Sequence, residues 1–207
     1  MPSLRYWLLA AGSLLTAPPT SAQRATPAPT LRAFSEQRIR HQRAVGYTLG
    51  SYALANVVAG AIGASRTTAE TNAFHRMNAY WNLVNLGLSG ATLLALRHKT
   101  GEGESLATAV RQHETMKQVL LVNAGLDVAY VMGGLYLRER GRADAPGGAT
   151  DKAAQQRGYG RSIMLQGGFL FAFDLVNYLI FKRRGDRQEG LLLGAGPDGV
   201  GLVMPIR

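Results

Sequence analysis

The segment MNAYWNLVNLGLSGATLLAL, residues 77–96, decides the fold, because it is uncharged throughout and still carries asparagines at a helical spacing. About twenty residues of α-helix are needed to cross the hydrocarbon core of a bilayer. Three further segments, 44–65, 118–137 and 162–181, lack Lys, Arg and Glu and contain only two Asp between them. The sequence therefore predicts an all-α fold, a four-helix transmembrane bundle.

The regions around these spans carry different signals. Arg5, an apolar run and a small-residue site ending at Ala22 are typical of a cleavable signal peptide. Pro27 and Pro29 disfavour helix in the next segment, and Pro197-Asp198-Gly199 has the composition of a β-turn. The predicted divisions are a signal peptide at 1–22, a disordered Pro-containing arm at 23–40, a transmembrane domain at 41–184 and a tail with a possible β-hairpin at 185–207.

Charge and cysteine content limit the partners. The net charge is +10, but the basic residues flank the spans instead of following one amphipathic face, which favours anionic lipid head groups over nucleic acid. The chain has no cysteine, so disulfides and thiolate metal sites are excluded. The signal peptide and the positive-inside bias predict opposite orientations, and the orientation stays open. Association with another membrane protein or with a second copy also stays open.

Polar side chains follow one edge of each predicted helix. On the second helix this edge consists of His75, Asn78, Asn82, Asn85 and Ser89, and on the first it consists of Thr48, Tyr52, Asn56 and Gly63. Hydrocarbon cannot hydrogen-bond these groups, so the four edges should turn inward and meet. The candidate ligand- or ion-binding residues are Asp127, Asp174, Asn56, Asn78, Asn82, Asn85, Asn123, Asn177, Gln166, Tyr130 and His75.

Asp127 and Asp174 differ from the asparagines because ionisable groups are costly at membrane depth. No Lys or Arg lies within any span to neutralise them. Each is therefore protonated, fully hydrogen-bonded by Asn and Tyr neighbours, or bound to a cation. We place Asp174 at the margin of the polar face of the fourth span, and Asn177 within it.

An internal repeat is visible, since Trp81-Asn82-Leu83-Val84-Asn85-Leu86 matches Phe173-Asp174-Leu175-Val176-Asn177-Tyr178, which suggests a duplicated helical hairpin. Three blocks also resemble a family of uncharacterised bacterial four-span integral membrane proteins. They are Phe74 to Asn85, Asn123-Ala124-Gly125-Leu126-Asp127 running on to Gly133-Gly134-Leu135-Tyr136-Leu137, and Gly158-Tyr159-Gly160 with Gln166-Gly167-Gly168-Phe169-Leu170. The resemblance implies a multi-pass protein of the bacterial inner membrane. It implies no activity.

Three functions remain in competition. The polar core binds or passes a small solute such as a proton or monovalent cation, or its Asn and Asp layers only specify helix packing. The third alternative is an intramembrane lipid-modifying enzyme with His75 as base, although no catalytic motif is present. No cofactor is predicted, because His41, His98 and His113 lie at one membrane edge and His75 at the other, which does not suit haem. A surface metal site from the first three is geometrically feasible.

Overall fold

The structure, a computed structural model, describes residues 31–144 and 150–194, with side chains as far as Gln188. Its helices are α1 (Leu31–Arg66), α2 (Ala69–Leu96), α3 (Leu106–Ala143) and α4 (Asp151–Gly194). No strand occurs in these two ranges. The predicted all-α fold with four helices is confirmed.

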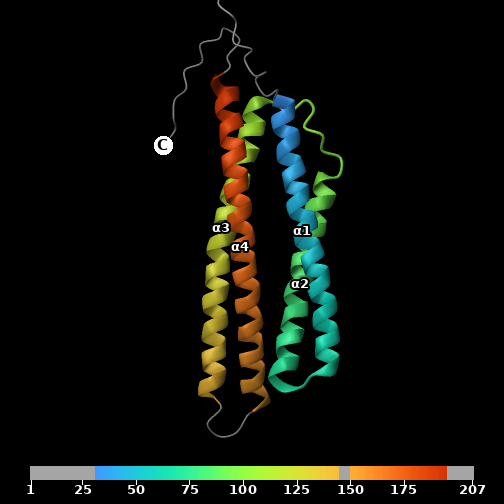
Figure 1. The fold of residues 1–207 in the computed structure, drawn as a ribbon, viewed down its shortest axis with the longest axis vertical. Coiled ribbons are helices and arrows are strands. Elements are labelled where there is room, and N and C mark those ends of the chain that lie inside the picture. Colours follow the sequence, from blue (N-terminus) through green and yellow to red (C-terminus); the bar gives the residue numbers. More distant parts are fainter. Residues whose placement is uncertain (1–30, 145–149, 195–207) are drawn as a thin grey trace, which may run out of the picture.

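The helices form two antiparallel hairpins that stand side by side, α1 with α2 and α3 with α4 (Figure 1). The hairpins meet mainly where α4 packs on α2. In contrast, α2 and α3 make no close backbone approach to each other. One side of the bundle is therefore a packed seam and another is a groove, and this asymmetry positions the site described below.

The outer surface of the bundle is apolar. Three stretches are long and apolar enough to cross a membrane: Leu31–Arg66, Leu106–Ala143 and Asp151–Gln188. Large exposed apolar patches are rare on soluble monomers, so this surface indicates a membrane protein. Its exposed side chains include Leu54, Val58 and Ile62 of α1, Leu83, Val84 and Leu88 of α2, Leu121, Val122 and Met132 of α3, and Leu165, Val176 and Leu179 of α4.

Glycines set the close seams. At the α3–α4 contact, a Cβ added to Gly134 would lie 2.7 Å from the carbonyl oxygen of Gly160. At the α2–α4 contact, a Cβ on Gly158 would clash with the carbonyl oxygen of Glu70. Any larger residue at these positions would push the backbones apart, as in other membrane bundles held by small residues.

The prediction of a disordered arm over 23–40 is wrong for residues 31–40, which form the first turns of α1. Phe34 and Ile39 are buried there, and Glu36 pairs with Arg32 and Arg40 at helical i, i+4 spacing. Burial of two large side chains and local ion pairs stabilise this extension. The rest of the arm and the predicted signal peptide lie outside the described residues.

The C-terminal boundary also differs from the prediction. α4 continues to Gly194, so residues 185–194 of the predicted tail are helical. The remaining part of that tail lies outside the described residues. The internal repeat stays a prediction, because the two hairpins are consistent with a duplication but no other feature supports it.

Candidate functional site

A hydrogen-bond network joins α1, α2 and α4 in the middle of the bundle. Gln166 accepts from the Tyr52 hydroxyl at 3.0 Å and donates through Nε2 to Oδ1 of Asn78. Asn78 donates through Nδ2 to Oδ1 and the backbone oxygen of Asn56, both at 3.2 Å, and Asn56 donates to the backbone oxygen of Tyr52. We call these four residues the three-helix network. Both polar atoms of each of its amides have a partner inside the protein.

A cavity of about 250 Å³ lies next to this network, in the groove between α2 and α3. We call it the carboxyl cavity. The rings of Trp81 and Tyr130 meet across it edge to face, with centroids 4.8 Å apart. Its remaining lining residues are Leu49, Val84, Asn85, Leu88, Asn123, Leu126, Asp127, Leu170, Phe173 and Asp174. Exposed Val84, Leu88 and Leu126 form its rim, so the cavity opens laterally toward the surroundings of the bundle.

Two carboxyl groups face each other in this cavity. Asp127 is 3% exposed and Asp174 is 8% exposed, and their side chains interact directly. The Asn123 amide also hydrogen-bonds to Asp174. No Lys, Arg or His of the described residues lines the cavity. Because two ionised carboxylates in contact repel each other, such a pair holds a shared proton or a cation.

Some polar atoms around the carboxyl pair have no partner among the described residues. They are Oδ2 of Asp127 and Nδ2 of Asn85, both on the cavity wall, and Oδ1 of Asn82 one turn further along α2. Buried polar groups are normally hydrogen-bonded, so unpartnered ones mark a place where a ligand, an ion or water is accommodated. They set the carboxyl cavity apart from the three-helix network.

The polar side chains form a file along the bundle axis. At one end, His41 Nε2 lies 3.2 Å from Asn177 Oδ1, and Asn177 is one turn from Asp174 on α4. At the other end, the ring of His75 packs where a Cβ on Gly63 would be, beyond the three-helix network. Along α1, the distance from His41 to Gly63 is about 33 Å, which matches the hydrocarbon thickness of a bilayer.

The comparisons with known proteins give a family but no activity. Residues 48–175 match the model of a family of unknown function (DUF6992). The chain belongs to this family. The DUF6992 region includes every residue of the three-helix network and every residue that lines the carboxyl cavity, whereas His41 and Asn177 lie outside it. No curated protein and no solved structure matches the chain.

The predicted polar edge of α2 is confirmed from Asn78 onward, because Asn78, Asn82, Asn85 and Ser89 are four of the six buried residues of that helix, whereas His75 is only half-buried. Two placements were wrong. Thr48 is exposed, since the buried line of α1 runs through Gly46, Ala53 and Gly60 instead. On α4, Asp174 is buried and Asn177 is only half-buried, the reverse of the expected order.

The structure separates the other predicted residues. Asp127, Asp174, Asn85, Asn123 and Tyr130 meet at the carboxyl cavity. Gln166, Asn56 and Asn78 belong to the three-helix network, and Asn82 lies beside it and donates to the backbone oxygen of Asn78 at 2.8 Å. Asn177 and His75 lie at opposite ends of the polar file. The prediction therefore named one site where the structure has two clusters and two outliers.

Sequence reasoning missed a buried polar group at the His41 end of the bundle. Arg38 is buried in an ion pair with Glu104 at 2.7 Å and also donates to Gln112. The ring of His113 is buried between Phe34 and Phe181. Phe34 and Arg38 are one helical turn apart, which would have indicated a shared buried face. This spacing was overlooked because the segment was predicted to be disordered.

The surface metal site from three histidines does not form. His98 is exposed and pairs with Arg97, whereas His113 turns inward and lies 3.2 Å from Asp186. His113, Glu114 and Asp186 do bring potential ligand atoms within 4.8 Å of one another. However, Lys117 Nζ contacts both carboxylates, so an ammonium group already supplies the cation there.

Two pKa shifts reflect this burial at the His41 end. Burial lowers the pKa of His113, although the hydrogen bond to Asp186 partly opposes the shift. Burial would raise the pKa of Asp186, but hydrogen bonds from Lys117 and His113 outweigh it and lower that pKa. At neutral pH, His113 is therefore neutral and Asp186 ionised.

Proposed function

We propose that the protein is a four-span membrane protein whose carboxyl cavity binds a proton or a monovalent cation and passes it along the polar file. The observation that carries the proposal is the buried pair of Asp127 and Asp174, with an unpartnered oxygen on Asp127 and no basic residue on the cavity wall. Charged groups inside membranes are generally functional because they are costly to keep there.

The donor set favours a small, singly charged ligand. Two carboxyl groups and the neighbouring amides of Asn85 and Asn123 are the polar groups on the cavity wall, apart from the rings of Trp81 and Tyr130. Calcium takes six to eight oxygen ligands, and magnesium keeps a full octahedron with several waters. A proton shared by the carboxyls, or a partly dehydrated monovalent cation, suits this set better.

A fourth span is part of the proposal. α2 is not among the helices that qualify as spans by length and composition alone, because asparagines interrupt its apolar residues, but it packs along both α1 and α4. Its 28 residues extend about 42 Å, enough to cross the bilayer beside them. Basic residues at both ends of the bundle support contact with anionic head groups, and the resemblance supports the bacterial inner membrane.

The test is flux in reconstituted vesicles. Wild-type protein, Asp127→Asn and the matched exposed control Asp144→Asn are inserted into vesicles that contain a pH-sensitive dye, with K⁺ or Na⁺ gradients applied. We expect Asp127→Asn to reduce proton or cation flux at least tenfold, and Asp144→Asn to retain the wild-type rate. Wild-type flux no greater than that of protein-free vesicles, together with no cation binding in detergent, would contradict the proposal.

A structural role is the second candidate, and the three-helix network favours it. Its amides are satisfied within the protein, as expected for groups that only fix helix register. In that case, Asp127→Asn would lower thermal stability in detergent and abolish co-purification with a membrane partner, while flux would stay at background in every variant.

A further inference from the structure

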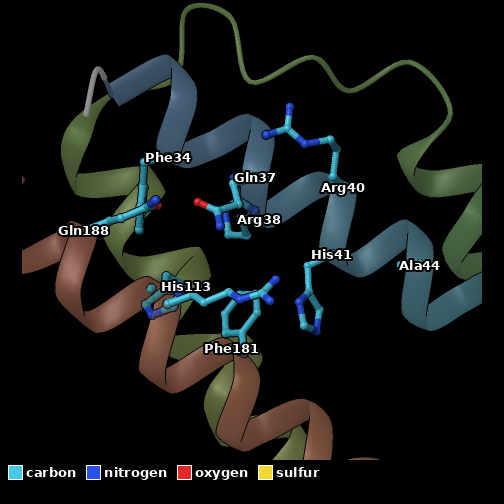
Figure 2. A pocket seen from close by; sticks show the side chains of 11 residues that line it. Phe34, Gln37, Arg38, Arg40, His41, Ala44, His113, Phe181 and Gln188 are labelled. Atoms are coloured by element: carbon cyan, nitrogen blue, oxygen red, sulfur yellow. The ribbon is translucent and has the colours of Figure 1, made fainter. Parts of the chain in front are cut away.

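A second cavity, of about 340 Å³, lies at the His41 end of the bundle, where predicted spans begin and end. Figure 2 shows side chains of α1 on one side and of α3 and α4 on the other. None of its residues belongs to the carboxyl cavity or the three-helix network. The lining residues are Phe34, Gln37, Arg38, Arg40, His41, Ala44, His113, Phe181, Arg184, Gly185 and Gln188. We call it the basic cavity.

The lining is strongly cationic. Among the described residues, the lining contains three arginines and no Asp or Glu. Arg38 is neutralised by Glu104, which fixes its guanidinium, but its buried Nε has no partner among the described residues. Within the described part of the chain, the ion pair of Arg40 is a long, exposed contact of 3.6 Å to Glu36. The excess positive charge therefore belongs to Arg40 and Arg184, and an unfilled donor lies on the wall beside them.

The charges of the cavity act on one another. Burial is the main cause that lowers the pKa of His41. The hydrogen bond to Asn177 opposes this shift, and the positive charge of Arg184 adds to it. Arg184 makes no ion pair with any residue of 31–144 or 150–188. An anion beside Arg184 would stabilise this unpaired positive charge and reduce its effect on His41.

The position of the cavity matches the head-group layer. Its walls include Ala44 and Phe181, the residues at which two of the apolar segments begin and end. The stacked rings of His113 and Phe181, 4.5 Å apart, give it an apolar floor beneath the arginines. A basic rim over an apolar floor at this depth suits a group that is anionic at one end and joined to an acyl chain at the other.

We propose that the basic cavity binds a phosphate group, carried by an anionic lipid or free, between Arg40 and Arg184 with Arg38 at its wall. Arginine recognises phosphate through paired N–H donors, which is why fixed guanidinium groups recur at such sites. This binding is independent of the proposed cation function, because the two cavities share no residue.

The test compares three probes on protein in dodecyl maltoside: dioctanoyl phosphatidic acid, dioctanoyl phosphatidylcholine and inorganic phosphate, with thermal shift and calorimetry as readouts. We expect Arg40→Gln/Arg184→Gln to weaken binding of phosphatidic acid at least tenfold. Both side chains are exposed, so the variant should fold like the wild type. Exposed Arg183→Gln, on the same helix but outside the cavity, should bind like the wild type.

The arms separate the two sources of phosphate. Binding of phosphatidic acid alone assigns the site to a lipid head group, and equal binding of inorganic phosphate with the same arginine dependence assigns it to the free ion. Three results would overturn the proposal: unchanged binding by the double variant, equal binding of phosphatidylcholine, or an equal loss with Arg183→Gln. The single variants Arg40→Gln and Arg184→Gln, each weakening binding in part, provide a further check.

Discussion

The three-helix network and the carboxyl cavity are neighbours in one bundle and are built from the same residue types, yet they differ in how their polar atoms are satisfied. In the network, each amide oxygen and nitrogen meets a partner on the same or another helix. In the cavity, Asp127 and Asn85 each keep an unpartnered buried atom beside free volume. A polar cluster that only stabilises the fold is therefore distinguished from a candidate binding site by whether its buried polar atoms have hydrogen-bond partners, and not by its residue types.

The largest expected effect is a loss of stability when the three-helix network is disrupted. Gln166→Leu removes bonds to Tyr52 and Asn78 and leaves a buried amide oxygen of Asn78 short of a donor. Interhelical bonds average only about 0.6 kcal/mol in membranes, but a stranded buried group brings the loss of unfolding free energy to about 1–3 kcal/mol. Thermal unfolding in detergent measures it. Gln118→Leu, exposed at the end of a span, should change little, and equal losses would erase the distinction.

The second effect is on how readily a small reagent reaches the carboxyl cavity. The chain has no cysteine, so single cysteines are clean reporters. Asn85→Cys, on the cavity wall, should react with N-ethylmaleimide at least about tenfold faster than Asn82→Cys, one turn away and fully buried. Labelling rates in native membranes give the ratio. Similar rates would mean that the cavity is no more accessible than the packed interior beside it.

A smaller effect is expected at the His41 end of the bundle, where the stability should depend on pH through His113. Burial lowers the pKa of His113 below its ordinary value of 6.5, so the unfolded chain takes up that proton first as the pH falls. Its contribution to stability is therefore present above about pH 6.5 and is lost as the pH falls through the pKa of the folded state. His113→Gln should flatten the decline of Tm between about pH 6.5 and 5.

The matched control for this experiment is His98→Gln, because His98 is exposed whereas His113 is buried. It should keep the wild-type pH dependence of Tm. A His113→Gln profile that is as steep as that of the wild type would assign the decline to other groups.

The smallest effect is the most discriminating. Asp127→Asn keeps shape and hydrogen-bonding capacity while removing the need for two carboxyls to share a proton. We expect the unfolding free energy to stay within about 0.5 kcal/mol of the wild type, since no saturated contact is lost. Calorimetry in detergent checks it. A loss as large as that of Gln166→Leu would show that Asp127 is a structural member of the core.

Much of the fold was predictable, because hydrophobic segment length and helical spacing are local properties. The polar edge of α2 follows directly from the positions of Asn78, Asn82 and Asn85. The split into two clusters was not predictable, since it depends on which helices touch: Gln166 reaches Asn78 across α4 and α2, while α2 and α3 stay apart. The long first turns of α1 were missed because proline upstream suggested disorder.

The missing α2–α3 contact has a mechanical consequence. The α3–α4 hairpin is attached to the other hairpin along the α4–α2 seam, and α3 also reaches α1 where Arg38 meets Gln112. Gly158 lets the backbones of α4 and α2 come close together, so the contact between these two helices can serve as a hinge. A small swing of α3 about it would widen or narrow the space around Asp127, while every bond between Tyr52, Gln166 and Asn78 stays intact. The missing contact between α2 and α3 therefore leaves free volume beside Asp127 and Asp174 and also lets the carboxyl cavity open and close.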